Sequence, residues 1–205
     1  MGNKLTDIKH AAIIFCAGNS SRMGKPKPLL QVKGISLIET CIANYRSACI
    51  SNIKVIANES LFKDSEFSFT TGKFNVDVIV NSFPEKGRTY SIKLAAENSL
   101  SQEGCFFQNI DNPAPSGNAI VEMSKLLRNA NDYIVPFVNG INGHPVLIGE
   151  SILKHLASKR GLDWNLRDEL RGFNRVYFKS DNENLIINLN TPLDWEKYKS
   201  SIDRV

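Results

Sequence analysis

Several features that define other classes of protein are missing from this 205-residue sequence. No apolar run approaches the ~20 residues that a membrane-spanning helix needs. The polar N-terminal stretch MGNKLTDIKH has no apolar signal-peptide core. None of the four cysteines (Cys16, Cys41, Cys49 and Cys105) belongs to a C-x-x-C pair. We therefore expect a cytoplasmic protein without a membrane partner, in which the cysteines are reduced and fill space in the core.

The sequence also lacks blocks of basic residues with interleaved aromatic residues, so we expect no nucleic-acid partner. The formal net charge is +4, from 25 Lys and Arg against 21 Asp and Glu. This mild excess suits a small anionic ligand such as a triphosphate. The length and the 42% content of hydrophobic residues suit one folded domain over residues 1–205. No feature of the sequence indicates an oligomeric state.

Short apolar segments alternate with segments of helical periodicity. Predicted strands cover 11–17, 53–57, 76–80, 105–110 and 133–138, and predicted helices cover 37–48, 91–100 and 120–129. Ser36 is the expected N-cap of the first helix. The alternation predicts a single-domain α/β fold with a doubly wound, mostly parallel sheet in a Rossmann-like, three-layer arrangement. Such sheets bind ligands outside the carboxyl ends of their strands.

The loop after the first predicted strand, residues 18–28, has the composition of a phosphate-binding loop. Glycines let backbone N–H groups approach phosphates closely. Cations neutralise the charge that develops while a phosphate bond breaks. The loop supplies both kinds of residue, together with two serines: Gly18, Ser20, Ser21, Arg22, Gly24, Lys25 and Lys27. A solvated basic turn is the plainer alternative.

Two better-known phosphate-binding motifs are excluded by single positions in this loop. A P-loop requires a hydroxyl residue after its lysine, and here Pro26 follows Lys25. A dinucleotide-binding fingerprint requires glycine at the third position, where Ser20 stands. The loop therefore belongs to another class of nucleotide-binding protein.

With its flanks, residues 15–30, the loop reads FCAGNSSRMGKPKPLL. It resembles the A-A-G-x-S-x-R-M-G-x-x-K-x-L-L signature of MobA-like nucleotidyltransferases, above all the molybdopterin guanylyl- and cytidylyltransferases. The resemblance implies the fold of the nucleotide-diphospho-sugar transferases and the magnesium-dependent transfer of a nucleoside monophosphate from a nucleoside triphosphate. It implies catalytic roles for Arg22 and Lys27. It implies nucleotide contacts by Ala17, Gly18, Asn19, Ser20, Gly24 and Lys25.

The segment 81–93, NSFPEKGRTYSIK, extends the resemblance. It is similar to the N-P…G-x-x-x-S-[IL]-[KR] segment of the cytidylyltransferase branch, so CTP is the expected nucleotide. The resemblance implies that Ser82, Gly87 and Ser91 lie beside the nucleotide. Ser91 is also expected to open the next helix, where a serine alone would be an ordinary N-cap.

Two further segments resemble the magnesium-binding elements of the family. Asp111, in FFQNIDNP, matches the aspartate of a strand-end D-x-P element. A carboxylate at the tip of a buried strand suits a hard cation that also holds phosphate oxygens. A turn-capping aspartate is the plainer alternative. Residues 186–195 resemble a closing [DN]-x-[DN]-T-P-x-D element, which implies that Asn190 is the second ligand and that Thr191-Pro192 begins a helix.

The acceptor side is matched by residues 135–148, which resemble a P…G-x-x-G-H-P-V-L segment and imply acceptor contacts by Gly143 and His144. A histidine before a proline is otherwise structural. Residues 108–110 (QNI) are more polar than the family pattern, and residues 162–167 match its G-D-x-G-x-R segment only loosely. Both departures lie in acceptor-facing regions of the family.

The expected acceptor is therefore a small phosphorylated or acidic molecule, with molybdopterin as one candidate. Two alternatives stay open. The chain could transfer the nucleotide to a sugar 1-phosphate or another small acceptor, or it could be a catalytically silent nucleotide-binding or regulatory module of the same fold.

Overall fold

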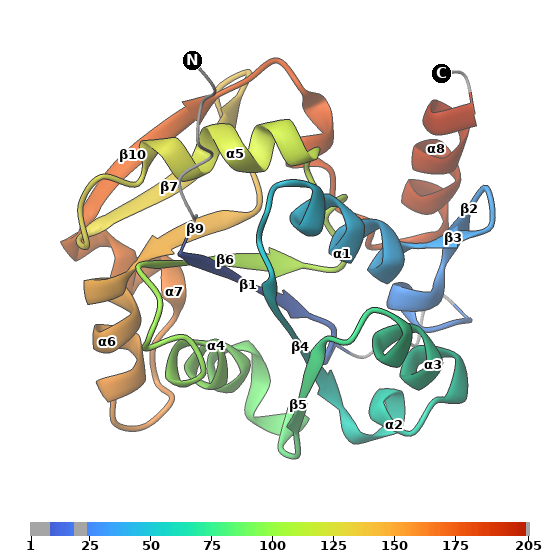
Figure 1. Cartoon of the computed structure of the whole chain (residues 1–205), viewed down its shortest axis with the longest axis horizontal. Coiled ribbons are helices and arrows are strands. Elements are labelled where there is room, and N and C mark those ends of the chain that lie inside the picture. Colours follow the sequence, from blue (N-terminus) through green and yellow to red (C-terminus); the bar gives the residue numbers. More distant parts are fainter. Residues whose placement is uncertain (1–8, 19–23, 204–205) are drawn as a thin grey trace.

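The computed structural model describes residues 9–18 and 24–203 and contains a central sheet with helices on both faces (Figure 1). The strands are β1 (His10–Phe15), β4 (Asn52–Asn58), β5 (Asp77–Asn81), β6 (Gly104–Asn109), β7 (Asp132–Val138), β8 (Ile141–Asn142), β9 (Val146–Gly149) and β10 (Asn174–Lys179). Their order is β10-β7-β9-β6-β1-β4-β5, and β8 pairs with β7. Within this sheet, β9 pairs antiparallel with β6 and β7, and β8 pairs antiparallel with β7, whereas all other pairs are parallel. The predicted α/β fold with a mostly parallel sheet is confirmed.

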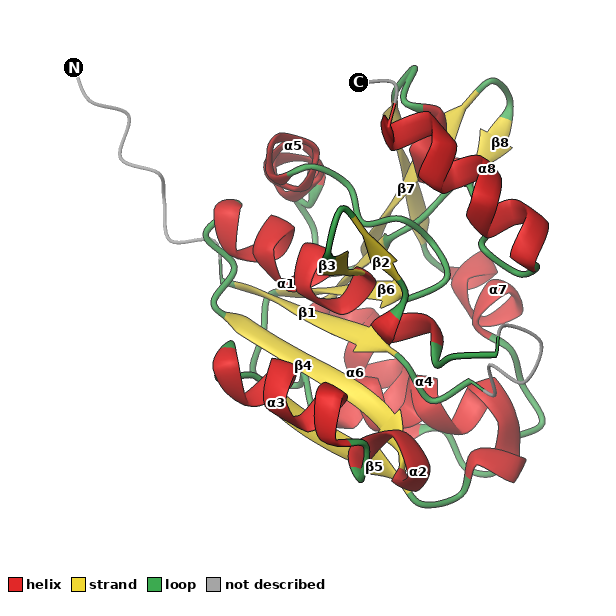
Figure 2. Ribbon diagram, turned by 90° about the vertical axis from the view of Figure 1, so that its right-hand side faces the viewer, coloured by secondary structure: helices red, strands yellow, loops and turns green. Residues whose placement is uncertain are grey.

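Helices cover the two faces of the sheet as the three-layer prediction requires (Figure 2). The helices are α1 (Leu37–Ser47), α2 (Glu59–Phe62), α3 (Ser65–Lys73), α4 (Gly87–Glu97), α5 (Gly117–Leu126), α6 (Glu150–Ser158), α7 (Leu166–Glu169) and α8 (Pro192–Asp203). One core cluster contains Ile42 of α1, Phe67 of α3 and Ile120 of α5. The other contains Ile92 of α4 and Leu153 of α6. A small separate hairpin joins β2 (Gln31–Val32) to β3 (Ile35–Ser36).

Strand β1 lies in the middle of the sheet because its side chains are apolar on both faces. Ile14 belongs to one core cluster and Ile13 to the other. The strand pairs in parallel with β4 and β6, and Phe15 stands opposite Asn109. The carboxyl ends of β1 and β6 therefore meet at one edge of the sheet, and the phosphate-loop residues 16–18 come to lie beside residues 110–111.

Local capping explains where several helices begin. Ser36 forms a capping box with Glu39: the Ser36 Oγ accepts from the Glu39 N–H, and the Glu39 carboxylate accepts from the Ser36 N–H. The prediction of this N-cap is confirmed. Asn58 and Asp64 cap α2 and α3: their side chains accept from the N–H groups of Leu61 and Phe67. These two helices occupy most of the stretch 60–75, whose polar and aromatic sequence has no clear period.

Three expectations need correction. Helix α4 begins at Gly87, because a short 3-10 turn at Pro84–Lys86 leads directly into it. Ser91 therefore lies inside the helix and is not its N-cap. Helix α5 begins at Gly117, capped by Ser116. Cys49 is exposed just beyond the end of α1, whereas the other three cysteines are buried as expected.

No helix in the described ranges has both the length and the apolar character needed to cross a membrane.

Candidate active site

A cavity of about 280 Å³ opens where β1 and β6 end. The loop after β1, the start of α4 and the end of β6 form its walls. Six residues that the sequence singled out line it together: Ala17, Gly18, Lys27, Gly87, Ser91 and Asp111. They come from three separate segments of the chain, so the fold brings the phosphate loop, the 81–93 segment and the D-x-P element to one place.

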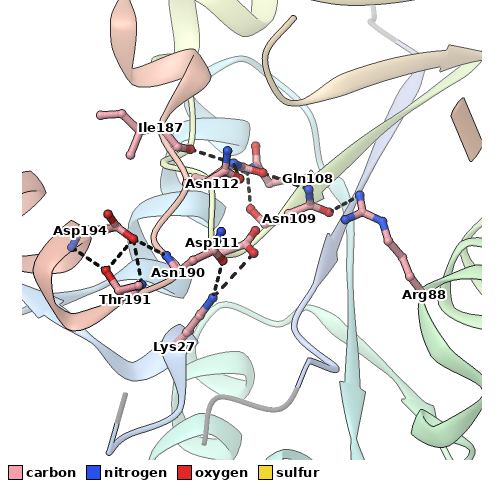
Figure 3. A network of polar contacts seen from close by, with 11 residues as sticks. Lys27, Arg88, Gln108, Asn109, Asp111, Asn112, Ile187, Asn190, Thr191 and Asp194 are labelled. Atoms are coloured by element: carbon pink, nitrogen blue, oxygen red, sulfur yellow. Dashed lines mark hydrogen bonds and ion pairs between the residues drawn. The ribbon is translucent and has the colours of Figure 1, made fainter. Parts of the chain in front are cut away.

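Lys27, Asp111 and Asn190 form a polar cluster at this edge of the sheet (Figure 3). The Lys27 Nζ lies 3.7 Å from the Asp111 Oδ2 and donates a hydrogen bond of 3.2 Å to the Asn190 Oδ1. The Lys27 side chain is 16% exposed and the Asp111 side chain 31%, so bulk water screens the pair only in part. One cation thus holds two oxygens that are far apart in sequence.

The same two oxygens suit a hard divalent cation. Magnesium commonly binds proteins through one or two carboxylates and completes its shell with water and substrate phosphates. Asp111 supplies a carboxylate and Asn190 a neutral amide oxygen, and both face the Lys27 ammonium group. No group of three or more His, Cys, Asp or Glu residues in the described part of the chain could hold a metal. The residues therefore fit a cation that arrives with a triphosphate and do not fit one held by protein ligands alone.

The polar run before Asp111 forms a buried hydrogen-bond network. Gln108, which is fully buried, donates to the backbone carbonyls of Asn109 and Asn112. It accepts a hydrogen bond of 3.2 Å from the Tyr45 hydroxyl. Asn109 donates to the Asn112 Oδ1 at 2.9 Å. These bonds explain why this strand end is more polar than the family pattern: each amide satisfies a group that would otherwise be buried without a partner.

Asn112 connects this network to the segment that carries Asn190. Its Nδ2 donates to the backbone carbonyl of Ile187 and to the Asn188 Oδ1, both at 2.8 Å. The Leu189 N–H donates to the Asp111 carbonyl at 2.7 Å. The position of Asn190 beside Asp111 therefore depends on side-chain and backbone bonds between segments about eighty residues apart in sequence.

The sequence analysis missed Arg88. Its guanidinium donates a hydrogen bond of 3.0 Å to the Asn109 Oδ1. The side chain lines the first cavity and also a second one of about 640 Å³ next to it. Arg88 stands at a position that the pattern of segment 81–93 leaves open. Its only signal in the sequence is that an arginine directly follows Gly87.

Gly143 and His144, the predicted acceptor contacts, both line the second cavity. A Cβ at Gly143 would lie 2.3 Å from the Leu185 carbonyl oxygen, so the backbone approach permits only glycine. The His144 N–H donates to that same carbonyl at 2.8 Å. The pKa of His144 is lowered to about 4, chiefly by burial and also by the charge of Arg88, while Asp111 opposes the shift. His144 is therefore neutral at physiological pH.

Other predicted nucleotide contacts lie further out. Lys25 forms an ion pair of 2.9 Å with Glu66. With Gly18 and Gly24 it lines a separate cavity of about 400 Å³. Ser82 is exposed and does not line the first cavity.

Ser91 is buried in the first cavity's wall, where its Oγ accepts a hydrogen bond of 3.0 Å from the Asn81 Nδ2. The predictions for Asn19, Ser20 and Arg22 fall outside the described residues.

A parallel α/β sheet with a cation, a carboxylate and an amide at the carboxyl ends of its strands defines an α/β protein of the nucleotide-binding class. Residues 12–174 match the model of the MobA-like NTP transferase domain, and the chain belongs to this family. The predictions of the family and of a nucleotidyltransferase are confirmed.

The chain resembles relatives from both branches of this family. It is 28% identical to the molybdenum cofactor cytidylyltransferase of Escherichia coli (strain K12), over 89% of this chain and 92% of that protein. It is 26% identical to the molybdenum cofactor guanylyltransferase of Campylobacter jejuni subsp. doylei, over 93% and 95%. A structure from Mycobacterium tuberculosis H37Rv, solved in complex with manganese, is 15% identical with a TM-score of 0.73, over 94% and 98%. This last likeness concerns the fold alone.

The Asn112 network predicts a loss of stability in the variant Asn112→Ala. The change leaves the Ile187 carbonyl and the Asn109 amide without their partner, so the free energy of unfolding should fall by about 2 kcal/mol. Urea unfolding measures this. Asn184→Ala is the control, because that side chain is exposed, and it should change stability by less than about 0.5 kcal/mol. Equal stability of the two variants would contradict the structural role of Asn112.

His144 predicts a dependence of stability on pH. Its pKa is lowered from 6.5 to about 4 in the folded chain. Between these values the unfolded chain binds a proton that the folded chain does not, so stability falls as the pH falls through this window. His144→Gln should reduce the loss between about pH 7 and about pH 4.5 by roughly 2 kcal/mol.

Urea unfolding of both proteins at the two pH values provides the test. His10, whose pKa burial also lowers, is present in both proteins and cancels in the comparison. Identical losses in the two proteins would show that His144 titrates normally in the fold.

Proposed function

We propose that this protein transfers a nucleoside monophosphate from a nucleoside triphosphate, with CTP preferred, to a small phosphorylated or acidic acceptor, and releases pyrophosphate. The convergence of Lys27, Asp111 and Asn190, of which Lys27 and Asp111 line the first cavity, is the observation that carries the proposal. We also keep the prediction of a cytoplasmic location, which the four cysteines without disulfide partners support.

In the proposed reaction an acceptor oxygen attacks the α-phosphorus in line, and the bond to the β-phosphate's bridging oxygen breaks. The acceptor is already anionic, so the step needs no strong general base. Catalysis then depends on positioning and on neutralising charge. Lys27 would shift from its protein oxygens towards the phosphates. Arg22, by its place in the signature, would stabilise the leaving pyrophosphate.

Magnesium is the proposed cofactor, with Asp111 and Asn190 as its protein ligands. When bound, it would neutralise phosphate oxygens at the reacting centre. Asn190 contributes an oxygen without charge, so Asp111 would be the main protein ligand. The fit rests on the two oxygens that face Lys27.

The nucleotide would lie along the first cavity. Gly87 has a φ of 73° and lines the cavity where α4 begins, so the backbone there is free of a side chain. We propose that Ala17 and Gly18 approach the phosphates and that Gly87 and Ser91 approach the base or ribose. Asn19, Ser20, Gly24, Lys25 and Ser82 remain proposed contacts.

The acceptor would occupy the second cavity, where Gly143 and His144 lie. Both relatives described above are transferases named for the molybdenum cofactor. Molybdopterin is therefore the first acceptor to assay.

Asp111→Ala tests the proposed chemistry. Loss of the charged ligand should lower kcat by roughly two to three orders of magnitude. Raising the magnesium concentration should restore little of it, because Asn190 alone is a neutral ligand. Turnover is measured as pyrophosphate release with CTP and molybdopterin.

Asp181→Ala is the matched control, since Asp181 is exposed and lines neither the first nor the second cavity. Both variants should keep a melting temperature near that of the parent. A folded Asp111→Ala protein with near-normal turnover would remove the main support for the proposal.

The preference for CTP is a separate prediction. It rests on the likeness of segments 81–93 and 143–145 to the cytidylyltransferase branch. With both nucleotides at equal concentration, CTP should be consumed faster than GTP. Product analysis by chromatography measures the ratio. Faster turnover of GTP would assign the chain to the guanylyl branch and leave the proposed transfer chemistry intact.

A further inference from the structure

The second cavity carries three arginines and no acidic residue. Arg88, Arg167 and Arg175 line it, whereas none of its lining residues is Asp or Glu. None of the three forms an ion pair with a carboxylate among the described residues, although their neighbour Arg171 pairs with Asp168 at 3.1 Å. Arginine presents a planar fork of donors that matches carboxylates and phosphates. The cavity is therefore built to receive negative charge.

Two of the three arginines, Arg88 and Arg175, are held by hydrogen bonds at separate places in the cavity. Arg88 donates to Asn109 at the border with the first cavity. Arg175 belongs to β10 and stands opposite Tyr133 of β7. Its Nε donates to the Tyr133 hydroxyl at 2.7 Å, and its Nη1 donates to the Tyr177 hydroxyl at 2.9 Å. Arg88 and Arg175 are therefore oriented by fixed partners.

Strand register gives the spacing between these two partners. Tyr133 stands opposite Ile148 of β9, which stands opposite Cys105 of β6. Asn109 lies four residues beyond Cys105 on the same strand. At ~3.3 Å per residue the two partners are offset by about 13 Å along the strands. Tyr133 and Cys105 belong to the same core cluster, so their side chains lie on the same face of the sheet. Side chains two and four residues beyond Cys105 lie on that face as well, so Asn109 shares it.

Part of the cavity wall is apolar. Ile92, Val135 and Leu170 line the cavity together with polar residues such as Thr89, Asn142 and Asn165. Arg167 joins the same wall from α7, which Asn165 caps by accepting from the Asp168 N–H at 3.0 Å. The cavity thus combines separated arginines with an apolar part of its wall.

We propose that the acceptor is a small, extended molecule with an anionic group at each end, joined by a largely apolar spacer. This rests on the proposed function. The proximal group lies at Arg88, and the distal group lies at Arg167 and Arg175. In the transfer, an oxygen of the proximal group forms the new bond to the α-phosphorus. The electron pair of the breaking bond leaves with pyrophosphate, and the distal group is unchanged.

Two phosphonates that differ in one end test this assignment. Hexane-1,6-bisphosphonate has an anionic group at both ends, and n-hexylphosphonate has one. By calorimetry on the full chain, the bisphosphonate should bind about tenfold more tightly or better, because it engages the distal arginines. Equal affinities, or no binding of either probe at millimolar concentration, would overturn the proposal.

Variants locate the effect. Arg167→Gln and Arg175→Gln should each weaken the bisphosphonate by about fivefold or more and leave n-hexylphosphonate within about twofold. Arg171→Gln is the control, because Arg171 pairs with Asp168 and does not line the cavity. It should leave both affinities unchanged. If the bisphosphonate keeps its advantage in Arg167→Gln and Arg175→Gln, it binds elsewhere and the assignment is wrong.

A parallel titration with CTP and magnesium distinguishes a failure of the acceptor proposal from a failure of the proposed function. If CTP binds but the phosphonates are not distinguished, the doubly anionic acceptor is wrong and the proposed function stands. If CTP does not bind, the proposed function fails, whatever the phosphonates do.

Discussion

The hydrogen bonds of Asn112 to the segment 187–188 hold the two halves of the candidate site together. Asp111 follows a central strand and needs no further support. Asn190 lies on an irregular segment before α8, where no sheet register fixes its position. Joining segments so far apart costs chain entropy, which the buried amide bonds and the Leu189 to Asp111 backbone bond must offset. A hydrophobic residue at position 112 would leave the Ile187 carbonyl without this partner and would remove one of the contacts that position Asn190.

The charge of Lys27 fits this arrangement. A half-buried carboxylate without a partner would be costly, and the Lys27 ammonium compensates it in the chain without ligands. The second oxygen comes from a neutral amide, so the cluster carries one negative and one positive charge. A second carboxylate at position 190 would bind a cation more strongly but would also repel an incoming triphosphate. In the proposed reaction, this pair would balance affinity for the metal against entry of the nucleotide.

The sequence predicted the parts of the fold that local patterns determine. The apolar run of β1, the Ser36 capping box and the strand-end location of Asp111 follow from neighbouring residues. The early start of α4 did not, because the 3-10 turn before Gly87 has no strong signature. The network of Gln108, Asn109 and Asn112 could not be predicted, since its bonds to Tyr45 and to residues 187–188 join segments far apart in sequence. The polar run was visible as a departure from the family, but its physical reason required the fold.

The two cavities differ in how closely their walls follow the family pattern. The first is built from β1, α4 and the end of β6, where the resemblance is most detailed. The second draws on α7 and β10, and Arg175 lies just beyond the matched residues 12–174. Arg88 borders both cavities, and its partner Asn109 belongs to the same network that holds Asn190. A change of acceptor would therefore require new residues only in the wall that α7 and β10 form. Arg88 and the hydrogen-bond network of Asn109 would keep the reacting groups in place.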